Sequence, residues 1–185
     1  FGLTEPNHGS DATHMETRAV PAARDNVKGW IINGEKMWTT GMHVATHCAL
    51  FARTSGNDGD ARGITCFLVP AKSLGVKVEE YMWTFNMPTD HPRVSFTDVF
   101  VPDDALFGEI GRGHKVALNT LNYGRFSLGA MCAGGSRGAI GDAAKYAAGR
   151  KQFGQPIASF GAIKHKLGEM VARTYAAESL AYRTA

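Results

Sequence analysis

The sequence predicts an α+β chain, in which an antiparallel β-barrel or sandwich over residues 1–110 precedes helices over residues 111–185. In the first part, short β-rich runs are separated by turn residues about every 8–12 positions. In the second part, apolar residues recur at helical spacing. Charge divides the chain at the same place: residues 1–110 hold 9 Lys and Arg against 14 Asp and Glu, a net charge of −5, whereas residues 111–185 hold 11 against 3, a net charge of +8.

The first part is expected to contain a hairpin and several further strands. Asn33-Gly34, a dipeptide typical of two-residue β-turns, lies between two β-rich runs and predicts that they pair as a hairpin. Alternation and β-branched residues predict the remaining strands, and clusters of Gly, Asn, Asp and Pro predict loops. The hairpin runs are 29–32 and 36–40, the other predicted strands are 49–52, 64–69, 76–80 and 94–101, and the predicted loops are 55–62 and 87–92.

Two helices are predicted in the second part, one through residues 125–148 and one after Ser159, which is placed to cap it. Glycine costs about 0.5–1 kcal/mol relative to alanine inside a helix. The glycines of the first helix therefore suggest that another backbone or a ligand approaches it closely. These glycines are Gly129, Gly134, Gly135, Gly138 and Gly141. The second helix has an apolar stripe of Phe160, Ile163, Leu167, Met170, Val171 and Thr174.

Composition excludes several classes of protein. With 44% hydrophobic and 10% aromatic residues in 185, the chain is not disordered, and no apolar run approaches the roughly 20 residues of a membrane span. The three cysteines and seven histidines show no disulfide framework or metal-ligand spacing. Phosphate-binding loops, dinucleotide fingerprints and nucleophile elbows are missing too. The chain opens at Phe1 without a Met, which suggests a piece of a longer protein.

The segment from Phe1 to Asp11 is rich in groups that bind small ligands. Thr4, Gly9, Ser10 and Asp11 offer hydroxyls and exposed backbone N–H groups. Such a nest can hydrogen-bond a planar heterocycle or a phosphate. The alternative is a polar surface turn in which Ser10 or Asp11 makes a local bond.

Trp38-Thr39-Thr40 closes the predicted hairpin. An indole followed by two hydroxyls can pack on an aromatic cofactor and bond one of its heteroatoms. The alternative is that these residues belong to the core of a strand.

Arg150-Lys151-Gln152-Phe153-Gly154 lies in the break between the two predicted helices. Two cations beside an amide and a glycine suit a diphosphate, because a guanidinium binds oxyanions in a bidentate fork. The alternative is a helix C-terminus whose basic residues complement the helix dipole.

The order of these motifs resembles that of the acyl-CoA dehydrogenase family of flavoenzymes over essentially all 185 residues. The T-E-P-x-x-G-S-D and R-x-Q-F-G patterns in this order are highly specific. Residues 122–126 and 178–182 look most like the very-long-chain branch and its bacterial relatives. The matching runs are Leu3-Thr4-Glu5-Pro6 with Gly9-Ser10-Asp11, Asn33-Gly34-Glu35-Lys36 with Trp38-Thr39-Thr40, Val101-Pro102 with Gly108-Glu109 and Gly113, and residues 150–157.

The resemblance implies a middle β-barrel domain over residues 1–110 and the first helices of a C-terminal four-helix bundle over residues 111–185. It also implies FAD as cofactor, with oxidation of acyl-CoA thioesters to trans-2-enoyl-CoA. In that reaction a carboxylate removes the α-proton while the β-hydrogen leaves as hydride to the flavin. Electrons then pass to an electron-transferring flavoprotein, and the subunits form a homodimer or homotetramer.

Site residues follow from the same resemblance. Those that match flavin-binding positions are Phe1, Leu3, Thr4, Gly9, Ser10, Trp38, Thr39, Thr40, Arg150, Gln152 and Phe153, the last three reaching FAD on a neighbouring subunit. Those that match substrate-binding positions are Ser10, Asn122, Tyr123, Gly124 and Arg125. No metal, nucleic acid or membrane span is expected.

The sequence departs from the family pattern at two places. The catalytic Glu of most branches would follow Ala185, and the alternative position for it is occupied by Gly124, so no catalytic residue is expected in this chain. Residues 85–91 differ from the usual pocket-shaping pattern. Within them, the loop of residues 87–91 looks more like that of bacterial members, which favours bacterial cytoplasm over the mitochondrial matrix. The alternative functions are an acyl-CoA oxidase and a non-catalytic relative that assists assembly or binds nucleic acid through its basic helices.

Overall fold

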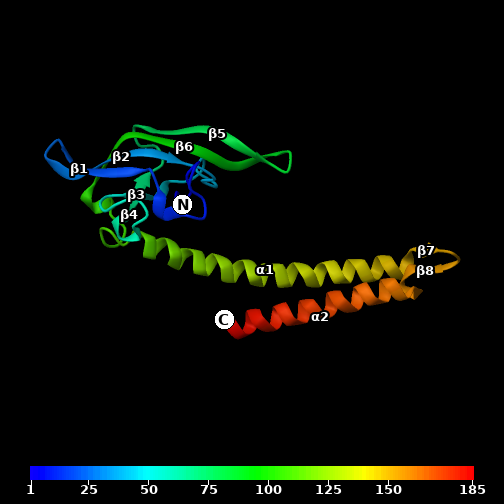
Figure 1. The fold of residues 1–185 in the computed structure, drawn as a ribbon. Helices are drawn as coiled ribbons and strands as arrows, with labels where there is room; N and C mark the ends of the chain where they lie inside the picture. The colour runs from blue at the N-terminus through cyan, green and yellow to red at the C-terminus, as the bar shows by residue number, and fades with distance from the viewer. The chain divides into compact units, whose positions relative to one another are not determined.

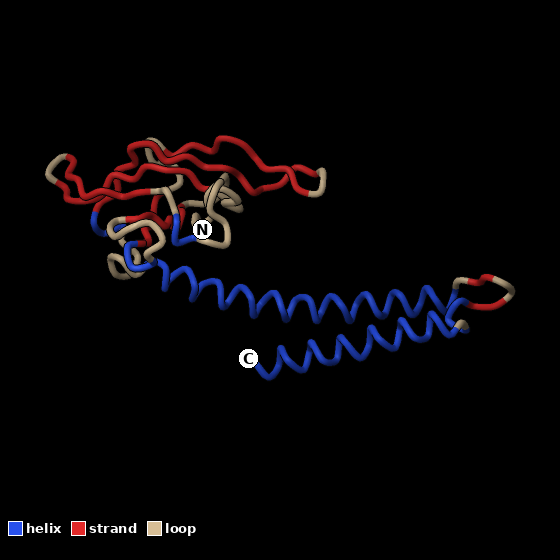
Figure 2. Tube along the Cα trace, viewed as in Figure 1, coloured by secondary structure: helices blue, strands red, loops and turns tan.

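The structure is a computed structural model that describes all residues from Phe1 to Ala185 (Figure 1). The chain divides into two compact units, Phe1–Asn119 and Thr120–Ala185. The first unit holds a six-stranded sheet and the second holds helices joined by a short hairpin (Figure 2). The predicted order, a β-domain followed by helices, is therefore confirmed.

The sheet of the first unit has the strand order β4-β3-β1-β2-β6-β5. All neighbours are antiparallel except β1 and β3, which meet in parallel at Arg18 and Arg53. β4 and β5 are its two edges, so the sheet is open rather than closed into a barrel. The strands are β1 (Arg18–Arg24), β2 (Val27–Lys36), β3 (His47–Arg53), β4 (Ile64–Pro70), β5 (Val76–Thr84) and β6 (Met87–Pro102).

The sheet curves back on itself around one apolar core. Trp30 on β2 lies against Phe67 on β4, with ring centroids 5.7 Å apart, although these strands are not neighbours in the sheet. Ile32, Val69 and Val99 of the same core are fully buried. Side chains alternate between the two faces of a strand, so the inward positions of five strands fill the enclosed space. This curvature is why a barrel-like description fits an open sheet.

The predicted hairpin at Asn33-Gly34 is wrong, because β2 runs straight through it. The β1–β2 turn is instead Asp25-Asn26, where both residues have positive φ. Opposite Asn33, the strand β6 bulges, and the Asn33 side chain accepts a hydrogen bond from the Asp98 backbone N–H at 2.8 Å. Gly34 is required because a Cβ there would lie 2.4 Å from Oγ1 of Thr17.

Two proline-containing segments were not predicted as strands. In β1, Pro21 pairs with β2, and the other edge of β1 meets β3 only at Arg18. Residues 87–92, predicted as a loop, begin β6 and pair with β5 alone, because β2 joins β6 only from Val94 onward. Proline is tolerated in both places because a strand with one free edge can lack an N–H donor there.

The helices are longer than predicted. α1 (Gly113–Gly149) begins well before residue 125, and its first turns belong to the first unit, where Ala117 is fully buried. The strands β7 (Lys151–Gln152) and β8 (Gln155–Pro156) follow, and then α2 (Gly161–Thr184). The short 3₁₀ turns are Ala12–His14, Ala61–Gly63, Asp103–Ala105 and Ile157–Ser159.

In the second unit, α2 runs antiparallel to α1 (Figure 1). Its predicted stripe is confirmed at Ile163, Leu167, Met170 and Thr174, which are half-buried, whereas Val171 is 54% exposed. Ser159 does not cap the helix: it lies within a 3₁₀ turn, and the N-cap is Phe160, which makes no side-chain cap bond.

The glycines of α1 do not meet the close approach that the sequence suggested. A Cβ at each of the five positions from Gly129 to Gly141 would meet no heavy atom within 4 Å. Their role in admitting another backbone or a ligand stays a prediction.

Candidate functional site

The segment that begins at Phe1 is fixed to the sheet by backbone hydrogen bonds. Gly2 donates to Ala49 O at 2.8 Å, and its own carbonyl accepts from Phe51 N at 3.0 Å. The Phe1 ring packs edge-on against Phe51, with centroids 5.0 Å apart. A Cβ at Gly2 would lie 3.2 Å from Cys48 Sγ, so the close approach to β3 favours glycine. Phe1 is thereby held beside β3 with 43% of its surface exposed.

A buried ion pair lies between this segment and β2. Lys36 Nζ is 2.8 Å from Glu5 Oε1 and also donates to Leu3 O at 3.1 Å. The other acceptor positions of Glu5 receive the backbone N–H groups of Glu16 and Thr17. Glu5 is 3% exposed and the Lys36 side chain is fully buried.

Burial and charge act against each other in the pKa values of this pair. Burial alone raises the pKa of Glu5, but the Lys36 ammonium and the donated hydrogen bonds outweigh it and lower the pKa below its ordinary value. Burial lowers the pKa of Lys36, and the Glu5 carboxylate opposes that effect in part. The pair is therefore held together by its mutual contact and by the backbone groups around it.

Residues 37–41 continue from β2 as a loop next to the first segment. Met37 N donates to Thr4 O at 2.9 Å, which places Trp38 one residue from the Thr4 contact. Trp38 is 41% exposed and has a φ of 61°, a conformation that is rare for a bulky residue. The alternative that Trp38 belongs to a strand core is therefore wrong, as is its place in a hairpin.

The same loop is fastened to β6 on its other side. Thr39 N donates to Pro92 O at 3.0 Å and Gly41 N donates to Asp90 O at 2.9 Å. The exposed Thr40 hydroxyl lies 2.8 Å from His91 Nδ1. Backbone strain at a bulky residue persists only where its surroundings hold it, and such residues cluster at functional sites. Trp38 meets that description.

Thr39 supplies the test of whether this loop suits a planar heterocycle. The residue is 1% exposed, and its Oγ1 has no hydrogen-bond partner in the structure. Leaving a buried hydroxyl unsatisfied costs about 1–3 kcal/mol. A buried orphan hydroxyl next to a half-exposed indole matches a ring system that stacks on one residue and bonds the other. The residues present therefore fit a flavin.

Gly9 and Ser10 lie on the exposed stretch between Glu5 and the 3₁₀ turn. Asp11 accepts a hydrogen bond from Thr13 Oγ1 at 2.6 Å and lies 2.6 Å from His14 Nδ1. Asp11 therefore makes local contacts, as expected for the alternative in which this segment is a polar surface turn.

The predicted substrate residues lie on α1 in the second unit. Arg125 Nη1 donates to Asn122 Oδ1 at 3.3 Å, and Tyr123 is 71% exposed. Gly124 faces open space. This turn therefore presents a guanidinium, an amide and a phenol on an exposed helix surface.

The predicted diphosphate residues lie on the β7–β8 hairpin. Phe153 and Gly154 form its turn with φ values of 51° and 77°. Phe153 is 92% exposed, and its ring makes an edge contact with Phe160 at 6.2 Å. The Arg150 and Lys151 side chains are exposed and have no carboxylate partner. A helix C-terminus does precede them, so the dipole alternative also fits their position.

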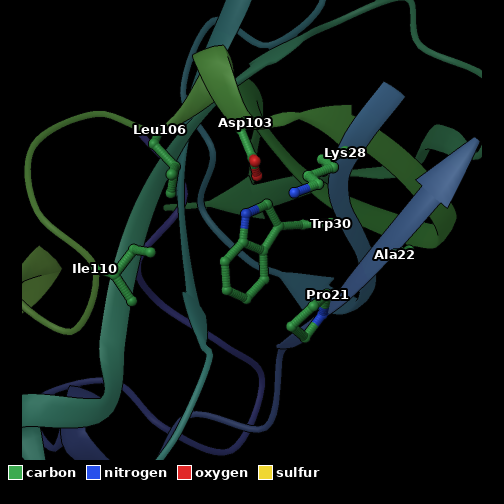
Figure 3. Close-up of a pocket in the computed structure, with 8 residues that line it drawn as sticks. Pro21, Ala22, Lys28, Trp30, Asp103, Leu106 and Ile110 are labelled. Atoms are coloured by element: carbon green, nitrogen blue, oxygen red, sulfur yellow. The ribbon is translucent and has the colours of Figure 1, made fainter. Parts of the chain in front are cut away.

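A separate cavity of about 560 Å³ lies between strands β1 and β2 and the segment that follows β6 (Figure 3). The Trp30 indole lies in the middle of the lining side chains, and Lys28 and Asp103 lie on the side that carries the ring nitrogen (Figure 3). None of the predicted site residues lines it.

Sequence reasoning missed the roles of Glu5, Lys36 and His91. A signal for Lys36 existed, because alternation along β2 places it on the same inward face as Trp30 and Ile32. A lysine at a core position requires a buried acceptor. The partner, 31 positions earlier in the chain, could not be read from that pattern.

Comparison with known proteins shows the family of this chain. Residues 1–99 match the acyl-CoA dehydrogenase middle domain, and residues 111–185 match the acyl-CoA dehydrogenase C-terminal domain. The human mitochondrial very long-chain specific acyl-CoA dehydrogenase is 38% identical over 98% of this chain and 28% of its own length. A subunit of the caffeyl-CoA reductase–Etf complex of Acetobacterium woodii is 37% identical over 100% of this chain and 48% of its own.

A solved structure shows the same fold. The acyl-CoA dehydrogenase of Bacillus anthracis, complexed with FAD, superposes with a TM-score of 0.88 at 37% identity, over 99% of this chain and 30% of that one. The chain thus spans from 28% to 48% of the length of these relatives. With the middle-domain match alone covering more than half of its residues, the chain belongs to the acyl-CoA dehydrogenase family.

Proposed function

We propose that the protein containing this chain is an FAD-dependent dehydrogenase that converts acyl-CoA thioesters to trans-2-enoyl-CoA. The observation that carries the proposal is the loop of residues 37–41. There the strained, half-exposed Trp38 stands beside the buried, unpartnered hydroxyl of Thr39. Bound FAD would supply the acceptor for the hydride that leaves the β-carbon. The family membership and the FAD complex of the Bacillus anthracis relative support the choice of cofactor.

This chain's residues would bind and orient rather than transfer protons. Trp38 would pack on the flavin ring and Thr39 or Thr40 would bond it, while Phe1, Leu3 and Thr4 would border it from the adjoining segment. Gly9 and Ser10 would add N–H and hydroxyl groups to the same loop, with Ser10 also facing the substrate.

In the second unit, the exposed cations are suited to phosphates. Arg150, Gln152 and Phe153 would reach the diphosphate side of FAD on a neighbouring subunit, which requires a homodimer or homotetramer. Residues 122–125 would contact the acyl-CoA substrate. Gly124 carries no carboxylate, so we assign no catalytic base within residues 1–185.

We further propose an electron-transferring flavoprotein as the redox partner. The Acetobacterium woodii relative, named as a subunit of a reductase–Etf complex, supports this choice. The relatives include mitochondrial and bacterial proteins, and we propose bacterial cytoplasm for this one. No helix of the chain combines the length and apolar character that crossing a membrane would require.

The reverse reaction, reduction of an enoyl-CoA, is the second candidate. The caffeyl-CoA reductase subunit and the human dehydrogenase differ by only one percentage point in identity to this chain. One arrangement of flavin and substrate serves both directions, because a catalyst lowers the same barrier from either side. The relative potentials of substrate and partner decide which direction runs.

The test is anaerobic titration of the protein expressed from its complete reading frame. Acyl-CoAs of increasing chain length are added while the long-wavelength absorbance of oxidised flavin is followed. We expect bleaching, and the chain length that bleaches fastest identifies the substrate class. Reoxidation of the reduced protein by enoyl-CoA, with faster kinetics than the forward step, would favour the reductase. A purified protein without flavin would contradict both proposals.

A further inference from the structure

The two loops that the proposed flavin site needs come from distant parts of the sequence, and one buried ion pair joins them. Glu5 directly follows Thr4, and Lys36 lies two residues before Trp38. Lys36 Nζ contacts Glu5 Oε1 at 2.8 Å and Leu3 O at 3.1 Å. Next to this contact, Met37 N donates to Thr4 O at 2.9 Å. The polar contacts between the two loops thus converge on the ion pair.

The ion pair also holds the C-terminal end of the loop that begins at Glu5. The Glu5 carboxylate accepts from the backbone N–H groups of Glu16 and Thr17, which lie just before β1. Residues 5–16, with Gly9 and Ser10 among them, are therefore closed into a loop whose two ends meet at one carboxylate. A change at Glu5 or Lys36 alters the anchor of this loop as well as its contact with residues 37–41.

Stability alone is a poor reason for a buried ion pair. Removing two charges from water is costly, and replacement of such a pair by apolar residues is often neutral or stabilising. A pair that fixes one geometry has a different use, because carboxylate and ammonium must meet at hydrogen-bond distance or remain unsatisfied. Here that geometry fixes Leu3 and Thr4 relative to Trp38 and Thr39.

We propose that Glu5 and Lys36 are positioning residues, and that their buried contact sets the relative placement of the two flavin-binding loops. The inference rests on the proposed flavin site for its functional consequence. Neither side chain is free to touch a ligand, because Lys36 is fully enclosed and Glu5 is 3% exposed. Their effect on the cofactor therefore passes through Leu3, Thr4 and Met37.

The test compares Lys36→Met, Glu5→Gln and the double variant in the complete protein. Lys77→Met is the control, because Lys77 forms an ion pair with Glu79 at 2.6 Å on the same sheet, with 70% of its side chain exposed. Apoprotein is titrated with FAD, and hydrogen exchange by mass spectrometry follows peptides that cover residues 1–17 and 36–41. For each single variant we expect FAD affinity to fall about tenfold or more and exchange to rise in both peptides. The control should match the wild type in both measurements.

The double variant separates positioning from general stability. Without either charge, no unpaired ion remains buried, so its thermal midpoint should recover toward the wild type. Leu3 O still lacks its donor, so FAD affinity and the shape of the flavin absorbance band should stay altered. Recovery of affinity together with the midpoint would overturn the proposal, as would singles that bind FAD normally. If Lys36→Met does not fold, the double variant still decides the question.

Failure of the proposed function gives a different pattern. A wild-type protein that binds no FAD would contradict the flavin site, and hydrogen exchange would then decide the positioning role alone. In that case, faster exchange in both peptides of the single variants supports joined loops. If hydrogen exchange in both peptides is the same as in the wild type, the proposal that the ion pair joins the two loops is rejected.

Discussion

Replacing Thr39 by valine should stabilise the protein without FAD but weaken the binding of FAD. Its Oγ1 is buried and has no partner, although the residue is only 1% exposed. Valine has nearly the same shape without the hydroxyl. Because an unsatisfied buried hydroxyl costs about 1–3 kcal/mol, Thr39→Val should raise the stability of the apoprotein by an amount in that range.

With FAD bound, the same substitution should be unfavourable. If the hydroxyl bonds the flavin ring, its loss removes about 1–2 kcal/mol of binding free energy, roughly a 5- to 30-fold increase in the dissociation constant. The assay is a pair of thermal melts, without FAD and with saturating FAD, together with an FAD titration. The variant should melt higher than the wild type without FAD and should gain less from added FAD.

Thr65 is the matched control. It is also 1% exposed, but its Oγ1 accepts from Gly111 N at 2.9 Å and lies 2.8 Å from Thr54 Oγ1. Thr65→Val should therefore destabilise the apoprotein by about 1–3 kcal/mol. If Thr39→Val lowers the apoprotein midpoint as Thr65→Val does, the reasoning about the orphan hydroxyl is refuted. A higher midpoint with unchanged FAD affinity would refute its role toward the flavin.

Three further predictions concern the first unit and α1. Gly34→Ala should destabilise by about 1–3 kcal/mol in denaturant titration, because its Cβ would lie 2.4 Å from the Thr17 hydroxyl oxygen. Gly9→Ala, with no atom within 4 Å of its Cβ, should change stability little, and equal effects of the two substitutions would contradict this reasoning. Burial raises the pKa of Cys66 to about 12, so thiol labelling mapped by mass spectrometry at pH 8 should modify the exposed Cys132 and spare Cys66 until unfolding. The pKa of Glu5 is lowered in the folded protein although burial opposes this, so just below pH 4.5, the ordinary pKa, the unfolded state binds more protons than the folded state. The free energy of unfolding should therefore fall as the pH drops through that range. Glu5→Gln should make the dependence of stability on pH flatter.

Local pattern was sufficient for the order of the chain, a β-domain followed by helices, and for most elements. The predicted strand 64–69 matches β4 to within one residue and the predicted strand 49–52 lies inside β3, while helical spacing identified α2 and its half-buried stripe. Local pattern gave a wrong prediction where the same residues are compatible with two different structures. Asn33-Gly34 is typical of a turn, but a side chain that seals a bulge and a glycine beside Thr17 satisfy the same pattern. The prolines of β1 and β6 are typical of breaks, although each strand has a free edge where no N–H is needed.

The site divides in the same way. The sequence by itself determined which segments bear hydroxyls, indole and cations, and their order along the chain was specific enough to indicate the family. Only the tertiary structure decided that Lys36 is buried against Glu5 and that Trp38 is half-exposed with its backbone in the left-handed region. The same holds for Thr39 Oγ1, which is buried without a hydrogen-bond partner. The physical reason is that propensity and periodicity act over a few neighbouring residues. Burial and ion pairing depend on groups that the curved sheet brings together from more than 30 positions apart.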